Sequence, residues 1–219
     1  MRKFQGIKAI LFDIDDTLFP SSAFASLARK NAIAAMFASG MQASSISAKK
    51  ELEKIISKYG SNYSGHFNRL VEKFKCKDKN YSVAAGIWAY HSTKACISPY
   101  PKVKNALLKL QKRGFILCVA SEGIEIKQWD KLIRLGLDSN FNHVFVTPKK
   151  DEKFYLSICK KLKLSPNQIL MVGDNPSKDI LEARKAGLKT LRILLGKHSK
   201  LKDTAHASST SCVQIGKYL

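Results

Sequence analysis

The residues best suited to chemistry are carboxylates that cluster at two distant points of the chain. Asp13 and Asp15 are separated by one residue, and Asp174 and Asp179 lie in the segment GDNPSKD at positions 173–179. Carboxylates brought into one crevice repel one another unless a cation neutralises them. Oxygen ligands of this kind suit a hard ion such as Mg²⁺. The pattern therefore predicts a magnesium site, provided that the fold brings the two segments together.

The elements that would position these carboxylates are short, continuous apolar runs, typical of strands buried on both faces of a parallel sheet. These runs occupy residues 8–12, 115–120, 143–146, 168–172 and 190–195. Helical patterns follow at residues 101–112, 126–135, 153–162 and 177–186. The alternation predicts an α/β fold with a Rossmann-like, doubly wound parallel sheet. Ligands of such sheets collect beyond the carboxyl ends of the strands, where Asp13, Ser121 and Asp174 are expected.

Residues 20–99 break this alternation and have a helical character. Helical spacing of apolar residues appears over residues 24–37, 51–59, 66–74 and 83–93. We therefore expect an α/β core, residues 1–19 and 100–219, interrupted by a small α-helical cap domain, residues 20–99. Residues 199–211 are polar and predict a loop, and residues 212–215 predict a last strand.

Three motifs, taken in order, resemble the haloacid dehalogenase superfamily on its phosphatase side. They are LFDIDDTL at residues 11–18, VAS at 119–121 and VGDNPSKDI at 172–180. The phrases at residues 126–137 and 183–190 are similar to members that carry a helical cap between the first and second motifs. The resemblance covers nearly the whole chain. It implies a Mg²⁺-dependent hydrolase whose mobile cap closes over the site.

The resemblance implies a role for each carboxylate. Asp13 would be the nucleophile that attacks phosphorus and forms an aspartyl-phosphate. Asp15 would protonate the leaving alcohol and then activate the hydrolytic water. Mg²⁺ ligands would be the carboxylates of Asp13 and Asp174 and the backbone carbonyl of Asp15. Asp179 would be a further metal contact, direct or through water.

The resemblance also implies phosphate-binding residues. Ser121 would donate a hydrogen bond to a phosphate oxygen, and Thr17 would organise the loop around the phosphate. A lysine would balance the charge between nucleophile and phosphate. Counting back from the predicted helix places Lys149 at that position, while Lys150 and Lys153 are alternatives.

Asp15 decides between the two main chemistries of this superfamily. A dehalogenase displaces halide, which needs no proton, and such members lack an Asp two positions after the nucleophile. We therefore predict a phosphatase for a small phosphorylated metabolite, such as phosphoglycolate, a sugar phosphate or a nucleoside monophosphate. A 2-haloacid dehalogenase is the alternative enzyme, and a sugar-phosphate mutase is a third.

Composition excludes other classes and leaves one alternative open. The chain has 219 residues and 38 Lys plus Arg against 17 Asp plus Glu, a net charge of +21. A nucleic-acid-binding protein is therefore the alternative non-enzyme class, but the basic clusters scatter and no recognised nucleic-acid motif accompanies them. No apolar run approaches the ~20 residues that span a bilayer, so no membrane partner is expected. Five widely spaced cysteines without a CxxC pair predict a reducing, cytoplasmic location.

Overall fold

The computed structural model describes residues 3–219 and divides them into two compact units. The first unit contains the residues up to Ser22 and Ser98–Leu219, and the second contains Ala23–Ile97. The insertion predicted from sequence covered residues 20–99. Each unit has its own buried apolar cluster, so each is described by itself.

The first unit is built on a six-stranded sheet in the order β5-β4-β1-β6-β7-β8. Every neighbouring pair is parallel, as predicted for a doubly wound α/β fold. The strands are β1 (Ala9–Phe12), β4 (Ile116–Glu122), β5 (His143–Thr147), β6 (Ile169–Gly173), β7 (Lys189–Ile193) and β8 (Ala207–Ser209). All residues of β1 and β6 are buried, which explains their continuous apolar sequence.

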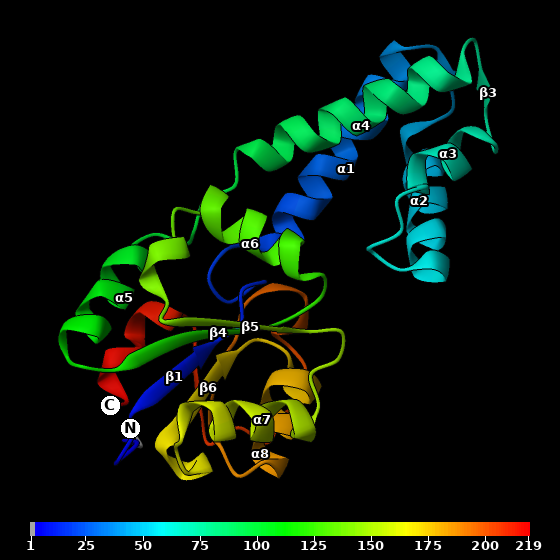
Figure 1. Cartoon of the computed structure of the whole chain (residues 1–219). Coiled ribbons are helices and arrows are strands. Elements are labelled where there is room, and N and C mark those ends of the chain that lie inside the picture. The colour runs from blue at the N-terminus through cyan, green and yellow to red at the C-terminus, as the bar shows by residue number, and fades with distance from the viewer. Residues whose placement is uncertain (1–2) are drawn as a thin grey trace. The chain divides into compact units, whose positions relative to one another are not determined.

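Helices cover both faces of this sheet (Figure 1). On one face lie α7 (Glu152–Leu162) and α8 (Glu182–Lys185), which contribute to the cluster around Leu11 and Met171. On the other lie α5 (Val103–Lys112) and the C-terminal 3₁₀ helix η5 (Cys212–Lys217). Helix α6 (Glu125–Arg134) follows β4. Short 3₁₀ turns complete the unit: η1 (Asp138–Asn140), η2 (Pro166–Gln168) and η4 (Gly196–His198).

Three sequence-based assignments are corrected. The expected strand at residues 212–215 is the 3₁₀ helix η5. Ser211 is its N-cap, and the Ser211 hydroxyl accepts a hydrogen bond from the Val213 amide. The expected loop at 199–211 contains the edge strand β8, which is too short and polar to show a period. The expected helix at 177–186 is a π-helical segment η3 (Pro176–Leu181) followed by one turn of α8.

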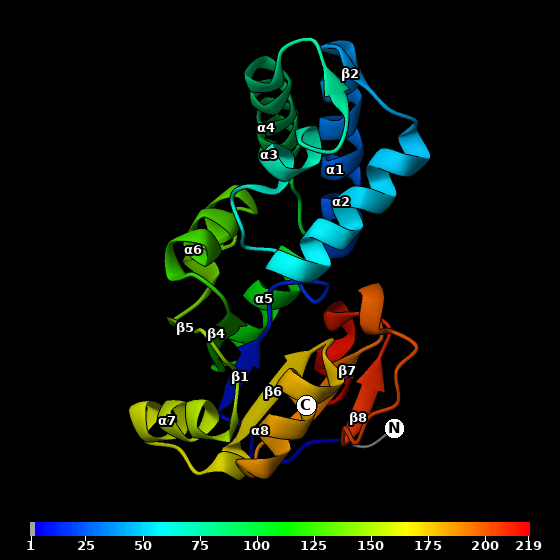
Figure 2. The same cartoon turned by 90° about the vertical axis from the view of Figure 1, so that its right-hand side faces the viewer.

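The second unit is helical with one small strand pair. Its elements are α1 (Ser21–Ala38), β2 (Met41–Gln42), α2 (Ser45–Tyr59), α3 (His66–Val71), β3 (Lys75–Cys76) and α4 (Lys79–Ala95). Helices α1 and α4 run alongside each other (Figure 2) and are linked by hydrogen bonds from Asn31 to Thr93 and from Ser39 to Ser82. Met36 and Leu70 are fully buried in this unit. No helix among residues 3–219 is long and apolar enough to cross a membrane.

The sheet reverses its strand order at β1, and this sets the place of a ligand site. From β1 the chain builds outward to β4 and β5, then returns to place β6 on the other side of β1. Phe12 is in register with Val119 of β4 and Val172 of β6. The residues that follow these three strands therefore emerge together at one edge of the sheet, where open α/β folds bind ligands.

Candidate active site

A polar hollow lies at the carboxyl ends of β1, β4 and β6. Residues from five segments line it, among them Asp13, Asp15, Ser121, Lys150, Asp174 and Asp179. The two carboxylate segments that are more than 150 positions apart in sequence are thus brought together, as the metal-site pattern required.

Asp13 lies at the base of the hollow, directly after β1. Its amide donates to the Val172 carbonyl at 2.9 Å, which continues the ladder with β6 by one residue. Burial raises the pKa of Asp13 to about 7, and Asp179 and Asp15 add to the rise while Lys150 opposes it. A carboxylate in this position is costly to ionise unless positive charge stands beside it.

Lys150 supplies such a charge from the loop before α7. Its Nζ lies 2.5 Å from Asp13 Oδ1 and 2.6 Å from Asp179 Oδ1, and its side chain is buried. Burial disfavours the ammonium, but Asp13 and Asp179 outweigh burial and raise the pKa of Lys150 well above its ordinary value. Lys150 is therefore charged at neutral pH, and it links Asp13 after β1 to Asp179 after β6.

The structure brings Lys150, one of the two alternatives to the predicted Lys149, against Asp13 and Asp179. Lys149 is exposed, and Lys153, the other alternative, is also exposed on the first turn of α7. Lys150 directly precedes the residue that caps α7. Asp151 is the N-cap of α7 and accepts a hydrogen bond from the Phe154 amide.

Asp174 and Asp179 enter the hollow from β6 and η3. The π-helical segment begins at Pro176, after Asn175, whose side chain accepts hydrogen bonds from two amides of its first turn. Asp179 is buried and also accepts from the Asn175 amide at 3.0 Å. Gly173 leaves no room for a Cβ against the Asp179 carboxylate. Burial, followed by Asp13 and Asp179, raises the pKa of Asp174 to about 8.

These carboxylates have the chemistry of a divalent-metal site. One oxygen from each of Asp13, Asp174 and Asp179 lies within 4.8 Å of the other two, and all three residues are buried. Lys150 offsets only one of their three charges. Burial raises the pKa of both Asp13 and Asp174, and the neighbouring carboxylates add to the rise. The residues present therefore fit a hard, oxygen-binding cation.

The other predicted site residues fall in different places. Ser121 is buried at the end of β4 and lines the hollow. The Asp15 side chain is 44% exposed and pairs with Lys131, so its carboxylate stands apart from the metal cluster. Thr17 is fully buried beneath the loop, and its hydroxyl has no hydrogen-bond partner among the described residues. Thr17, expected to organise the loop around the phosphate, lies in the interior of that loop.

Sequence reasoning missed several residues around the hollow. Asp16 has a left-handed backbone (φ 52°) and accepts hydrogen bonds from the amide and hydroxyl of Ser22 at the start of α1. Glu122 follows Ser121 and accepts from the Lys150 amide and from the Lys178 ammonium. These links join the ends of β4 and β6 to the lysine loop, and a single sequence without the fold gives no pairing signal for them.

A buried arginine supports the loop that closes one side of the hollow. Arg192 in β7 is fully buried, and its guanidinium donates to the carbonyls of Asp174, His198 and Leu201 and pairs with Asp203. His198 lines the hollow and contacts the Asn175 side chain. The backbone of a metal-site residue is thus tied to the C-terminal loop.

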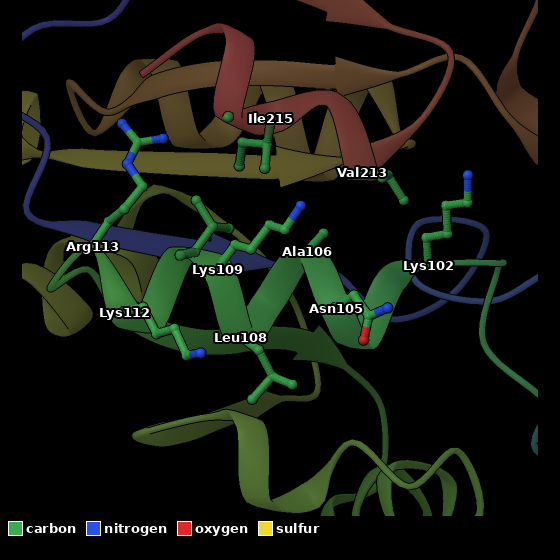
Figure 3. Close-up of a pocket in the computed structure, with 11 residues that line it drawn as sticks. Lys102, Asn105, Ala106, Leu108, Lys109, Lys112, Arg113, Val213 and Ile215 are labelled. Atoms are coloured by element: carbon green, nitrogen blue, oxygen red, sulfur yellow. The ribbon is translucent and has the colours of Figure 1, made fainter.

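A second hollow lies away from the strand ends, between α5 and η5 (Figure 3). It is lined by apolar and basic side chains, including Lys102, Lys109, Lys112 and Arg113. None of the described residues that line it is acidic, so it does not share the chemistry of the carboxylate site.

The sequence and the fold were compared with known proteins. Residues 10–193 match the family described as haloacid dehalogenase-like hydrolase. A glyceraldehyde 3-phosphate phosphatase of Methanopyrus kandleri is 39% identical over 203 residues, covering 89% of this chain and 87% of that one. The enzyme of the same name from Methanocaldococcus jannaschii is 38% identical over 210 residues, covering 93% and 92%.

Solved structures share the fold. A putative beta-phosphoglucomutase from Thermotoga maritima has a TM-score of 0.72 at 17% identity, covering 95% of this chain and 96% of the other. A predicted phosphoglycolate phosphatase from Haemophilus somnus 129pt has a TM-score of 0.68 at 23% identity, covering 97% and 98%.

The chain belongs to the haloacid dehalogenase-like hydrolases. Like the two phosphatases with which it aligns over most of both chains, it is a phosphatase of that family. The predictions of an α/β hydrolase fold and of a phosphatase are confirmed.

Proposed function

We propose that this phosphatase is magnesium-dependent and hydrolyses the phosphomonoester of a three-carbon sugar, of the glyceraldehyde 3-phosphate class. The observation that carries the proposal is the buried cluster of Asp13, Asp174 and Asp179 with Lys150 between two of its members. The relatives named for this substrate align over most of both chains, which supports the substrate class.

The proposed reaction has two halves, in which Asp13 is the nucleophile and Asp15 moves the proton. Asp13 attacks phosphorus with one carboxylate oxygen, an Asp13 O–P bond forms, and the bond from phosphorus to the ester oxygen breaks. Asp15 gives a proton to the departing oxygen, which leaves as the alcohol. In the second half, water attacks the same phosphorus and Asp15 takes its proton. The Asp13 O–P bond then breaks, and inorganic phosphate leaves.

The remaining residues hold charge and geometry during these steps. Lys150 offsets negative charge between Asp13 and the phosphoryl oxygens, and Ser121 at the end of β4 donates a hydrogen bond to one of them. Asp13, Asp174 and Asp179, with the backbone carbonyl of Asp15, would hold Mg²⁺. A bound Mg²⁺ would neutralise phosphate charge that Lys150 alone does not balance.

The proposal includes a reducing, cytoplasmic compartment. Among the described residues, all five cysteines are free thiols, and Cys118, Cys159 and Cys212 are buried. Free buried thiols agree with a location in which disulfides are rare.

The test is a substrate panel measured with Mg²⁺ and with EDTA. The panel contains glyceraldehyde 3-phosphate, phosphoglycolate, glucose 6-phosphate, AMP and p-nitrophenyl phosphate, with 2-chloropropionate as the dehalogenase probe. We expect kcat/KM to be highest for glyceraldehyde 3-phosphate and to vanish in EDTA. Asp13→Asn should abolish turnover of every phosphate ester. Full activity in EDTA, or turnover by Asp13→Asn, would overturn the mechanism, and a preference for another ester would overturn only the substrate.

A further inference from the structure

One face of α6 contacts Asp15, which lines the hollow. Lys131 Nζ lies 2.7 Å and 2.9 Å from the two carboxylate oxygens of Asp15, and 3.0 Å from Gln128 Oε1. Gln128 and Lys131 stand three positions apart on the helix, so their side chains share a face. The Lys131 side chain is only 14% exposed, although Asp15 itself is 44% exposed.

The lysine is held in place by a chain of contacts that begins at the end of β4. The Gln128 side chain is buried, and its Nε2 donates to the Glu122 carbonyl at 3.2 Å. That bond turns Oε1 toward Lys131. Gly123 has φ +144°, and a Cβ there would lie 2.6 Å from Gln128 Nε2. A side chain at position 123 would therefore displace Gln128.

Lys131 has a further neighbour in the catalytic loop. Its ammonium stands 5.6 Å from the centroid of the Phe19 ring, a cation–π distance. Phe19 and Asp15 also form a backbone bridge to each other. Lys131 thus touches both ends of the segment that follows the nucleophile.

We propose that Lys131 is a positioning residue for Asp15, with Gln128 as its support. The inference rests on the proposed function, in which Asp15 moves the proton of the leaving group. A side chain as exposed as Asp15 would otherwise sample several rotamers. Contact with both carboxylate oxygens holds it at the wall of the hollow. Proton transfer to the leaving oxygen requires such a fixed position, and a misplacement of about 1 Å can cost ~100-fold in rate.

A purely structural role for Lys131 makes a different prediction. A partly exposed ion pair contributes little to stability, and α6 is already anchored by the buried side chains of Leu132 and Leu135. We therefore expect Lys131→Met to unfold at the same temperature as the wild type and to be slowed only in the transfer of a proton to the leaving oxygen.

The test compares two leaving groups in kcat/KM, which reports the steps up to the first bond cleavage. Glyceraldehyde 3-phosphate releases an alkoxide that needs a proton, and p-nitrophenyl phosphate releases a weakly basic phenolate that needs none. If the wild type does not hydrolyse glyceraldehyde 3-phosphate, glycerol 3-phosphate is used as the alkyl ester instead. For Lys131→Met we expect a loss of ~100-fold on the alkyl ester and of less than ~3-fold on the aryl ester, since aryl ester cleavage does not use the acid.

Three other variants make the outcome decisive. Lys127→Met removes the same charge from an exposed position one turn earlier on α6 and should behave as wild type. Lys131→Arg should recover part of the alkyl-ester rate, because a guanidinium can also contact both carboxylate oxygens. Asp15→Asn should show the same selective loss as Lys131→Met, but larger.

Equal losses on both esters in Lys131→Met, or no loss on either, would overturn the inference. If Asp15→Asn shows the selective loss and Lys131→Met does not, the role of Asp15 stands and that of Lys131 falls. If Asp15→Asn shows no selectivity, the proton-transfer role in the proposed function is itself wrong.

Discussion

Arg192 gives the sharpest test of how the site is supported, because its guanidinium is fully buried and has four partners. The perturbation is Arg192→Met, which keeps most of the length of the side chain and removes its donors. Three backbone carbonyls, those of Asp174, His198 and Leu201, then lose a donor, and Asp203 loses its counter-ion.

The expected magnitude follows from these partners. An acceptor left without its hydrogen bond costs about 1 kcal/mol at the lower end of the usual range. Three carbonyls therefore cost ~3 kcal/mol. Removing one member of a buried ion pair destabilises a protein by about 3–5 kcal/mol, a range that begins at the same value. Asp203 is 17% exposed, so water can solvate the abandoned carboxylate. We accordingly expect the free energy of unfolding to fall by ~3 kcal/mol rather than by the upper value.

The assay is equilibrium unfolding in urea followed by tryptophan fluorescence. Because the chain has two compact units, the signal must come from one of them. Trp88, in the second unit, is 71% exposed and is replaced by Phe, which leaves Trp129 in α6 as the reporter of the first unit. Both the reference protein and the Arg192→Met variant carry this change.

Asp203→Asn is the matched control, since it keeps an acceptor for the guanidinium and removes only the charge. It should destabilise the first unit less than Arg192→Met does. A decrease below ~1 kcal/mol for Arg192→Met would refute the reasoning, because it would mean that the carbonyls are satisfied as well by water. A larger effect for Asp203→Asn would assign the stabilisation to the ion pair instead.

Three further predictions concern charge in the site and in the core. Lys150→Met should lower kcat for the preferred phosphate ester by at least ~100-fold, since it removes a preorganised charge from the site. Lys149→Met, which alters an exposed neighbour, should leave kcat within ~2-fold, and equal effects would reject the assignment of Lys150. Mg²⁺ at 100 times its dissociation constant should stabilise the wild type by ~2.7 kcal/mol in thermal or urea unfolding, and Asp174→Asn should lose this gain. Undiminished stabilisation of Asp174→Asn by Mg²⁺ would place the ion elsewhere. Burial raises the pKa of both Cys118 and Cys212 from 9.0 to about 12. Since the folded state holds these protons more tightly, their contribution to stability is complete below pH 9 and is lost as the pH rises toward 12. The urea midpoint should therefore fall between pH 9 and 11, and Cys118→Ala/Cys212→Ala should show a smaller relative fall.

The strand ends were predictable because burial on both faces leaves a clear signature. The runs ending at Phe12 and Val172 are continuous and apolar, and polar residues follow each of them at once. The identity of the site lysine was not predictable from a family phrase, because the loop before α7 departs from that phrase. Lys150 is distinguished from Lys149 only by its contacts with Asp13 and Asp179, which the fold creates.

The contacts of Asp15 and Arg192 show what a single sequence leaves out. Lys131 meets Asp15 across 116 positions, and nothing in the spacing of either residue indicates the pair. Arg192 stands between Leu191 and Ile193 in β7, and most of its partners lie in a loop without periodic pattern. Pairings of this kind depend on the packing of whole elements, which propensity and periodicity do not encode.

The position of β1 in the sheet has a consequence for the order in which the chain assembles during synthesis. β1 is the central strand, but its two neighbours begin at Ile116 and Ile169. The second unit, Ala23–Ile97, has its own buried cluster and is complete in the nascent chain before either neighbour is synthesised. The ribosome therefore releases β1 as an apolar segment without a partner strand, a state in which association with other chains competes with folding. Asp13 and Asp174 meet only when β6 pairs with β1, a strand made more than 150 residues earlier.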